Sequence, residues 1–183
     1  MPSEEEIDLA VFAQLSAEVQ AGYATGGADA WKASPFRWIK SEPSRRVGAI
    51  GEKLIEAWVL HEGIAVRAPV NTGHDRILNG VKIEVKFSTL WVGGGFTFQQ
   101  IRDQDYDVAA LLGLEPQKTH LWFVPKAVLF EHAVGQHTGA AARDTMWIRF
   151  NADSRPLWLG QYGGPLSTAR AALKEASRGL GRG

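Results

Sequence analysis

Residues 74–87 read HDRILNGVKIEVKF, and the Asn-Gly pair inside this stretch predicts a tight turn between two strands. Asn-Gly flanked by alternating apolar residues is the strongest short hairpin signal that a sequence offers. We therefore expect strands over 76–78 and 81–87, joined by a two-residue turn. In that register Asp75 faces Glu84 across the hairpin, with β-carbons about 4.5–5.5 Å apart.

Two carboxylates that face each other on a sheet repel, so this hairpin needs something to offset the repulsion. A divalent cation shared by Asp75 and Glu84 would do so, and so would a raised pKa with a shared proton. Lys86 points to the same face as Glu84, because side chains alternate along a strand. The ammonium group either takes part in the chemistry or only neutralises its neighbours, and the pattern leaves both open. The other face of this strand is apolar and is expected to be core: Val81, Ile83, Val85 and Phe87.

Periodicity and turn residues predict the remaining elements. We expect helices over 4–21, 45–62, 126–133 and 167–178, with Ser167 as the cap of the last helix. Further strands are expected over 64–67, 108–114, 121–124 and 145–150, and a short helix over 98–103. This order predicts an α/β sandwich in which helices flank a mixed central β-sheet. We expect one domain over 1–183, with a core at about 45–150 and the helices 4–21 and 167–178 as additions.

Composition excludes several classes of protein. The 183 residues include no cysteine, which excludes disulfides, thiolate metal sites and a cysteine nucleophile. No stretch approaches the roughly 18 apolar residues of a membrane span, and the acidic start is unlike a signal peptide, so we expect a soluble, cytoplasmic protein. No phosphate-binding loop appears, so no nucleotide cofactor is expected. Lys+Arg 20 balances Asp+Glu 20, which speaks against broad, nonspecific nucleic-acid binding but leaves room for a local basic surface.

The hairpin and its surroundings resemble the PD-(D/E)XK nuclease superfamily, which has the restriction-endonuclease-like fold. The family signature is an Asp at the end of one strand followed by Glu-x-Lys on the next, here Asp75 and Glu84-Val85-Lys86. Family members often have a helical Glu upstream, and Glu52 within RRVGAIGEKLIEAWV resembles it. They also often place a Gln-bearing helix after the Glu-x-Lys strand, which matches residues 98–102. The resemblance covers about residues 45–125.

The resemblance implies a restriction-endonuclease-like core and a Mg²⁺ site. Asp75, Glu84 and the Val85 carbonyl would bind the metal ion, and Glu52 would complete the site directly or through water. Lys86 would orient or deprotonate the attacking water and stabilise developing charge. The candidate DNA contacts, each otherwise an ordinary surface residue, are Gln100, Arg102, Arg45, Arg46 and Lys53.

The expected activity is Mg²⁺-dependent hydrolysis of phosphodiester bonds in double-stranded DNA. We expect a sequence-specific type II restriction endonuclease that acts as a homodimer. The alternatives are a Holliday-junction resolvase or repair nuclease of the same fold, and an inactive DNA-binding module. The seven tryptophans indicate either a Trp-rich core or subunit interface, or base stacking. Gly93–Gly95, beside Trp91, is either a flexible loop that approaches DNA or an ordinary tight turn.

Overall fold

The structure is a computed structural model that describes residues 30–135 and 145–179. The chain divides into two compact units, residues 1–34 and 35–183. All helices and strands of the described residues belong to the second unit. The helix predicted over 4–21 lies outside the described residues, so a single domain over 1–183 stays a prediction.

The described elements begin with two helices, continue with six successive strands, and end with helices and short strands in turn. The α-helices are α2 (Arg37–Lys40), α3 (Ser44–His61), α4 (Lys126–His132) and α5 (Leu166–Ser177), with a 3₁₀ helix η1 (Leu157–Tyr162). The strands are β1 (Val66–Arg67), β2 (Arg76–Leu78), β3 (Val81–Thr89), β4 (Gly95–Ile101), β5 (Val108–Leu114), β6 (Thr119–Pro125), β7 (Val134–Gly135), β8 (Met146–Asn151) and β9 (Gly163–Pro165).

The central sheet is mixed. It has six strands in the order β1-β2-β3-β5-β6-β9, and β3 runs antiparallel to β2 but parallel to β5. The hairpin turns at Asn79 and Gly80, which both have positive φ (49° and 91°), as a two-residue turn of the hairpin type requires. The predicted α/β class, with a mixed central sheet flanked by helices, is confirmed.

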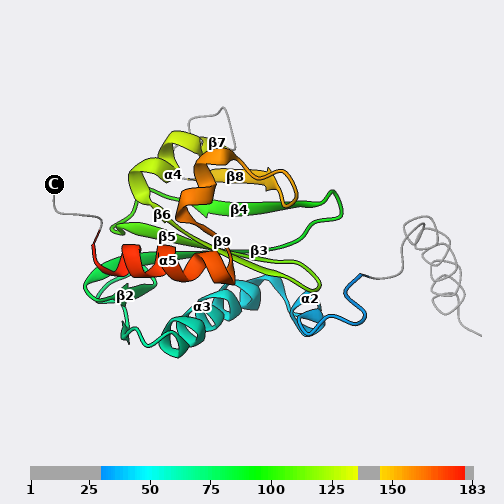
Figure 1. The fold of residues 1–183 in the computed structure, drawn as a ribbon, viewed down its shortest axis with the longest axis horizontal. Helices are drawn as coiled ribbons and strands as arrows, with labels where there is room; N and C mark the ends of the chain where they lie inside the picture. Colours follow the sequence, from blue (N-terminus) through cyan, green and yellow to red (C-terminus); the bar gives the residue numbers. More distant parts are fainter. Residues whose placement is uncertain (1–29, 136–144, 180–183) are drawn as a thin grey trace, which may run out of the picture. The chain divides into compact units, whose positions relative to one another are not determined.

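Helices α3 and α5 cover one face of this sheet (Figure 1). Trp58 of α3 stacks on Phe123 of β6, with ring centroids 6.4 Å apart. Gly51 allows α3 to approach β3 closely, because a Cβ at this position would lie 2.6 Å from the Cβ of Phe87. This approach brings the next residue of the helix, Glu52, toward the catalytic strand predicted from the sequence.

A second, three-stranded sheet in the order β4-β8-β7 covers the other face of the central sheet. The main core lies between the two sheets and is rich in aromatic rings. Trp122 of β6 meets Phe150 of β8 edge to face, with centroids 5.3 Å apart. Phe96 and Phe98 of β4 are fully buried against the same tryptophan. The connection from β3 to its parallel neighbour β5 therefore passes through β4 in the second sheet.

The helix predicted over 98–103 is wrong. These residues continue β4, which pairs with β8 from Gly95 to Ile101. The reason is the alternation at the start of the strand, where Phe96 and Phe98 both point into the aromatic core. The Gln-bearing helix implied by the family resemblance is therefore absent here, and Gln100 lies in an irregular part of the strand with a positive φ of 56°.

Other boundaries differ by smaller amounts. Ser167 does not cap α5, which begins at Leu166 after Pro165 and has no side-chain cap hydrogen bond. The strand predicted over 64–67 is only Val66–Arg67. The predicted helices over 45–62 and 126–133 and the strands over 108–114, 121–124 and 145–150 are present, each shifted or extended by at most two residues at an end.

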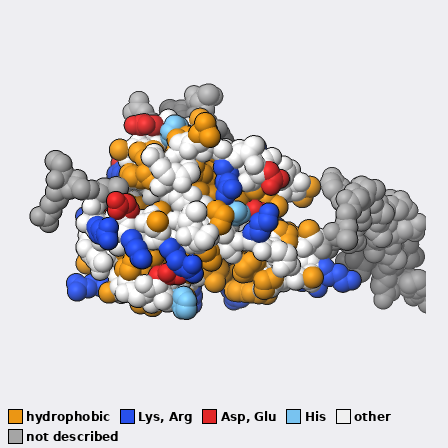
Figure 2. Space-filling model, viewed as in Figure 1, with side chains coloured by type: hydrophobic (Ala, Val, Ile, Leu, Met, Phe, Trp, Pro, Cys, Tyr) orange, Lys and Arg blue, Asp and Glu red, His pale blue; other side chains and the backbone are white. Residues whose placement is uncertain are grey.

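Charged side chains are spread over the surface. Figure 2 shows one face of the molecule, on which Lys and Arg side chains lie among hydrophobic and uncharged ones. Two of the exposed cations, Arg170 and Lys174, belong to α5. Within the described residues, no helix is long and apolar enough to cross a membrane.

Candidate active site

Asp75 lies immediately before β2, at the open end of the hairpin and away from the turn at Asn79 and Gly80. The predicted register is confirmed for three pairs, from Leu78 with Val81 to Arg76 with Ile83. The fourth predicted pair, Asp75 with Glu84, is not formed, because the N–H of Asp75 donates instead to the carbonyl of Ile83 at 2.9 Å. The strands part at this residue.

The carboxylate of Asp75 is held by the main chain of β3. Its Oδ2 accepts a hydrogen bond from the N–H of Val85 at 2.7 Å. Its own carbonyl accepts from Nη1 of Arg76 at 2.6 Å. The bond from Val85 fixes the carboxylate against the main chain of β3, while the Arg76 side chain holds the carbonyl of the same residue.

Glu84 and Lys86 lie on the face of β3 that is turned toward the second sheet, in register with Ala109 and Leu111 of β5. The Nζ atom of Lys86 donates to Oε1 of Glu84 at 2.7 Å, and the side chains are 15% and 9% exposed. Lys86 has three N–H donors, so two remain for other partners. Both faces of β3 are thus covered, which leaves an ion pair largely removed from water.

Burial raises the pKa of Glu84 above its ordinary value, and Lys86 opposes this effect. The negative charges of Asp75 and Glu52 raise this pKa further. The buried hydroxyl of Tyr106 lies near the same carboxylate, and its pKa is raised by burial and by the charge of Glu84. The carboxylates of this region therefore repel one another.

Glu52 reaches the site from α3. Its Oε2 accepts from Nη1 of Arg76 at 3.2 Å, while Nε of the same arginine binds Glu56 at 2.9 Å. Burial and the charge of Asp75 raise the pKa of Glu52. Arg76, which the sequence did not indicate as a site residue, thus links the helix to the hairpin.

A cleft of about 520 Å³ joins these groups. All four predicted catalytic residues, Asp75, Glu84, Lys86 and Glu52, line this cleft, so it holds three carboxylates and one ammonium group. The second wall comes from β4 and the turn before it, and its lining residues include Trp91, Thr97, Gln99 and Gln100.

The predicted DNA contacts divide into two groups. Gln100 is exposed and lines the cleft, but from a strand and not from a helix. The four predicted cations are exposed and do not line it: Arg102, Arg45, Arg46 and Lys53. Arg46 is paired with Glu42 at 3.3 Å. The roles of all five as DNA contacts stay predictions.

The turn before β4 is tight. The N–H of Trp91 donates to the carbonyl of Gly95, and the N–H of Gly94 donates back to the carbonyl of Trp91, both at 2.9 Å. Residues Gly93–Gly95 therefore form a tight turn, which is one of the two alternatives that the sequence left open. This turn leaves Trp91 about half exposed at the cleft, whereas Trp122 is buried in the core. The tryptophans therefore do not share one role.

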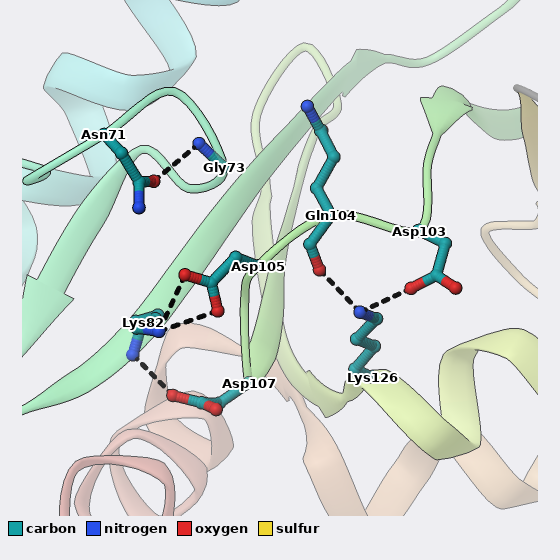
Figure 3. Close-up of polar contacts among 8 residues, drawn as sticks. All are labelled: Asn71, Gly73, Lys82, Asp103, Gln104, Asp105, Asp107 and Lys126. Carbon is teal, nitrogen blue, oxygen red and sulfur yellow. Dashed lines mark hydrogen bonds and ion pairs between the residues drawn. The ribbon is translucent and has the colours of Figure 1, made fainter.

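A polar network lies at the other end of β3 (Figure 3). Nζ of Lys82 binds both carboxylate oxygens of Asp105, at 2.7 and 2.8 Å. The N–H of Lys82 donates to Oδ2 of Asp107 at 2.8 Å. Asp105 also bonds Asn71, and this network ties the loop that leads into Asp75 to the loop before β5.

His74 precedes Asp75 and is buried, with 3% of its surface exposed. Within the described residues neither of its ring nitrogens has a hydrogen-bond partner. Lys82 lowers the pKa of Asp105, and the ring of His74 lies close enough for its charge to lower the pKa of that carboxylate further.

Two comparisons with known proteins find nothing, since no protein-family model and no curated protein matches the sequence. Comparison with solved structures finds a bacterial homing endonuclease, I-Ssp6803I. The two chains share 17% sequence identity, with a TM-score of 0.48, over 75% of this chain and 97% of that chain.

Proposed function

We propose that this protein is a Mg²⁺-dependent nuclease of the PD-(D/E)XK type, which hydrolyses phosphodiester bonds in DNA. The observation that carries the proposal is the cleft in which Asp75, Glu84, Lys86 and Glu52 meet. These residues come from two segments that are separate in the sequence, the helix α3 and the hairpin of β2 and β3. That they line one open cleft supports the proposal, because a phosphate group needs such access to reach them.

The donors of the cleft fit a hard cation. Mg²⁺ takes oxygen ligands, and the cleft offers carboxylate oxygens that repel each other without a counter-charge. We propose Asp75, Glu84 and the Val85 carbonyl as ligands. Within residues 30–135 and 145–179 no three acidic or imidazole side chains are grouped closely enough to hold an ion together. Glu52, whose carboxylate is engaged by Arg76, is therefore proposed to act through its charge or through water.

When bound, Mg²⁺ lowers the pKa of water and neutralises charge on the phosphate. Lys86 has the complementary role. One of its N–H groups is used by Glu84, which fixes the ammonium group at the cleft. The others can orient the attacking water and donate to a phosphate oxygen as negative charge develops there. Arg76 holds Glu52 and the main chain of Asp75 in place.

The narrower proposal is a type II restriction endonuclease that acts on double-stranded DNA as a homodimer. The equal numbers of acidic and basic residues support recognition through base contacts more than through a broad basic surface. A resolvase or repair nuclease of the same fold would instead prefer branched or damaged DNA. Cleavage of linear plasmid into discrete fragments supports restriction, whereas cleavage of a four-way junction alone supports the resolvase.

The test is a plasmid digest with three samples. They are the unmodified protein in MgCl₂, the unmodified protein in EDTA, and the Lys86→Ala variant in MgCl₂. Cleavage is expected only for the unmodified protein with Mg²⁺. Lys82→Ala is the matched control, because Lys82 lies on the same face of β3 and outside the cleft. Absence of cleavage with Mg²⁺, or cleavage in all three samples, contradicts the proposed function.

A further inference from the structure

Beside the β4 wall of the cleft, the neighbouring strand β8 carries an arginine that does not itself line the cleft and that the catalytic motif does not explain. Arg149 of β8 pairs with Thr97 of β4 in the ladder of the second sheet. Its Nε donates to Oγ1 of Thr97 at 3.1 Å, and Thr97 lines the cleft. The arginine is therefore anchored to the lining of the cleft by a neutral hydroxyl group.

An aromatic ring completes the setting of this arginine. The guanidinium carbon of Arg149 lies 5.9 Å from the centroid of the Trp91 ring, within the range of a cation–π contact. Trp91 is 51% exposed, although a large aromatic side chain is stabilised by burial. Both Trp91 and Thr97 line the same cleft as Glu84 and Lys86. The exposed ring thus lies beside the proposed catalytic groups.

The charge of Arg149 is not neutralised by a carboxylate within the described residues, since none lies within 4.0 Å of its guanidinium group. The cations nearest the carboxylates differ in this respect, because Lys86 and Arg76 are both bound to glutamates. Among the described residues, Arg149 therefore adds a positive charge beside the β4 side of the acidic cleft.

A polyanion that enters this cleft meets repulsion from the carboxylates, so a cation at the edge of the cleft adds to the affinity that the proposed metal ion and Lys86 provide. The guanidinium group is planar and matches two phosphate oxygens at once. Contacts to Thr97 and Trp91 hold it before the ligand arrives, which lowers the entropic cost of binding.

We propose that Arg149 binds the DNA backbone at a phosphate beside the scissile one, and that Trp91 supports the guanidinium group and contacts the adjoining sugar or base. This inference rests on the proposed nuclease function and assigns part of its substrate contact. Phosphate contacts position nucleic acid without reading its sequence, so the effect of Arg149 is the same for different duplexes.

Binding is measured by fluorescence anisotropy with labelled 30-base-pair duplexes of two unrelated sequences, in CaCl₂ and at a series of NaCl concentrations. Arg149→Ala should weaken binding to both duplexes about tenfold and reduce the slope of log affinity against log salt by about 1. Arg149→Gln keeps a hydrogen-bond donor toward Thr97 and should show the same reduction of the salt slope. Because this variant preserves the contact to Thr97, it controls for misfolding of Arg149→Ala. Arg149→Lys should retain the slope but recover only part of the affinity, because it lacks the planar fork.

Arg170→Ala is the control, because Arg170 lies on α5 and is paired with Glu62 at 2.8 Å. It should leave both affinity and slope unchanged. In cleavage assays Arg149→Gln should raise KM much more than it lowers kcat, which a merely destabilised site would not do. An unchanged salt slope in Arg149→Ala and Arg149→Gln overturns this inference, while Mg²⁺-dependent cleavage by the unmodified protein leaves the proposed function standing. If the folded, unmodified protein binds neither duplex and cleaves no plasmid, both proposals fail.

Discussion

Lys82, Glu84 and Lys86 form the charged face of β3, and the two ends of this face differ in how far their charges are removed from water. At one end Lys82 meets Asp105 and Asp107 on a surface that water reaches, with side chains of Lys82 and Asp105 that are 35% and 56% exposed. At the other end Glu84 and Lys86 are 9% and 15% exposed, and further carboxylates share their cleft.

The difference shows in the pKa of the acidic groups. Lys82 lowers the pKa of Asp105, so its ionised form is favoured in the folded protein. Burial raises the pKa of Glu84 despite its bond to Lys86. At the first end the charges are paired where water reaches them, whereas the second end holds three carboxylates and one ammonium group in a cleft that is largely removed from water. Functional sites commonly contain such a departure from the most stable arrangement.

The largest expected effect separates the two lysines of this face. Lys86→Ala should lower the rate of Mg²⁺-dependent cleavage at least about 100-fold, because it removes a group placed at the reacting phosphate. Lys82→Ala should change the rate by no more than about threefold, as expected of a surface substitution. Initial rates of plasmid nicking measure both. Equal losses in the two variants would show that the cleft end has no special role.

The next effect concerns the helix that brings Glu52 to the cleft. Gly51→Ala should destabilise the protein by about 1–3 kcal/mol, because the new methyl group meets Phe87 and forces α3 away from β3. Cleavage should fall as well. Gly48→Ala is the matched control on the same helix, since a Cβ there meets nothing within 4 Å. Thermal unfolding of the two variants measures the difference. Identical midpoints would contradict the close packing of α3 on β3 at Gly51.

A smaller effect should appear in stability without metal. Glu84→Gln removes one of the carboxylates that repel in the cleft, so it should raise the thermal midpoint in EDTA by about 2–4 °C, the shift expected for roughly 1 kcal/mol. The same substitution should abolish the stabilisation of the protein by added MgCl₂. Differential scanning calorimetry with and without the metal ion is the measurement. A lower midpoint in EDTA would mean that Glu84 stabilises the fold.

The pH dependence of stability should have opposite signs at the two ends. The pKa of Glu84 is raised in the folded state, so its favourable contribution is present below 4.5 and is lost as pH rises through the folded pKa. The advantage of Glu84→Gln over the unmodified protein should therefore grow as pH rises above 4.5. The pKa of Asp105 is lowered, so its contribution is present above 3.8 and is lost as pH falls through the folded pKa.

Asp105→Asn should show the smallest effect. It should shift the thermal midpoint at neutral pH by less than about 2 °C, because the ion pair is exposed and screened. Urea titrations of the unmodified protein and both variants, from pH 3 to pH 8, resolve the signs. Parallel curves for Glu84→Gln and Asp105→Asn would remove the electrostatic distinction between the two ends.

Elements with strong local signals were predicted well. Asn79-Gly80 determines the hairpin because few other residue pairs tolerate two positive φ angles. The apolar run of β5 matches the prediction at both ends, because it is buried on both faces. The helix α3 was also found within one residue at each end, since its apolar residues recur with helical spacing.

The prediction was wrong where a local pattern has two interpretations. The pattern is compatible with one turn of helix and with a strand that has a bulge, at Phe98-Gln99-Gln100-Ile101. The strand forms because Phe96 and Phe98 pack into the aromatic core between the two sheets. The second sheet itself joins β4 to β8, which are far apart in the sequence. The sequence also did not indicate Arg76, which binds Glu52, or Arg149, for which we propose a DNA contact, because neither residue stands in a motif.

By itself, the sequence determined the turn, the strand that carries Glu84 and Lys86, and the helix that carries Glu52, because these depend on residues close together in the chain. The tertiary structure alone decided that Asp75 leaves the ladder and bonds the main chain at Val85. It also decided that the second sheet covers the charged face of β3 and forms the second wall of the cleft. Such features depend on contacts between distant segments, where burial sets the strength of each charge, and no local pattern encodes that burial.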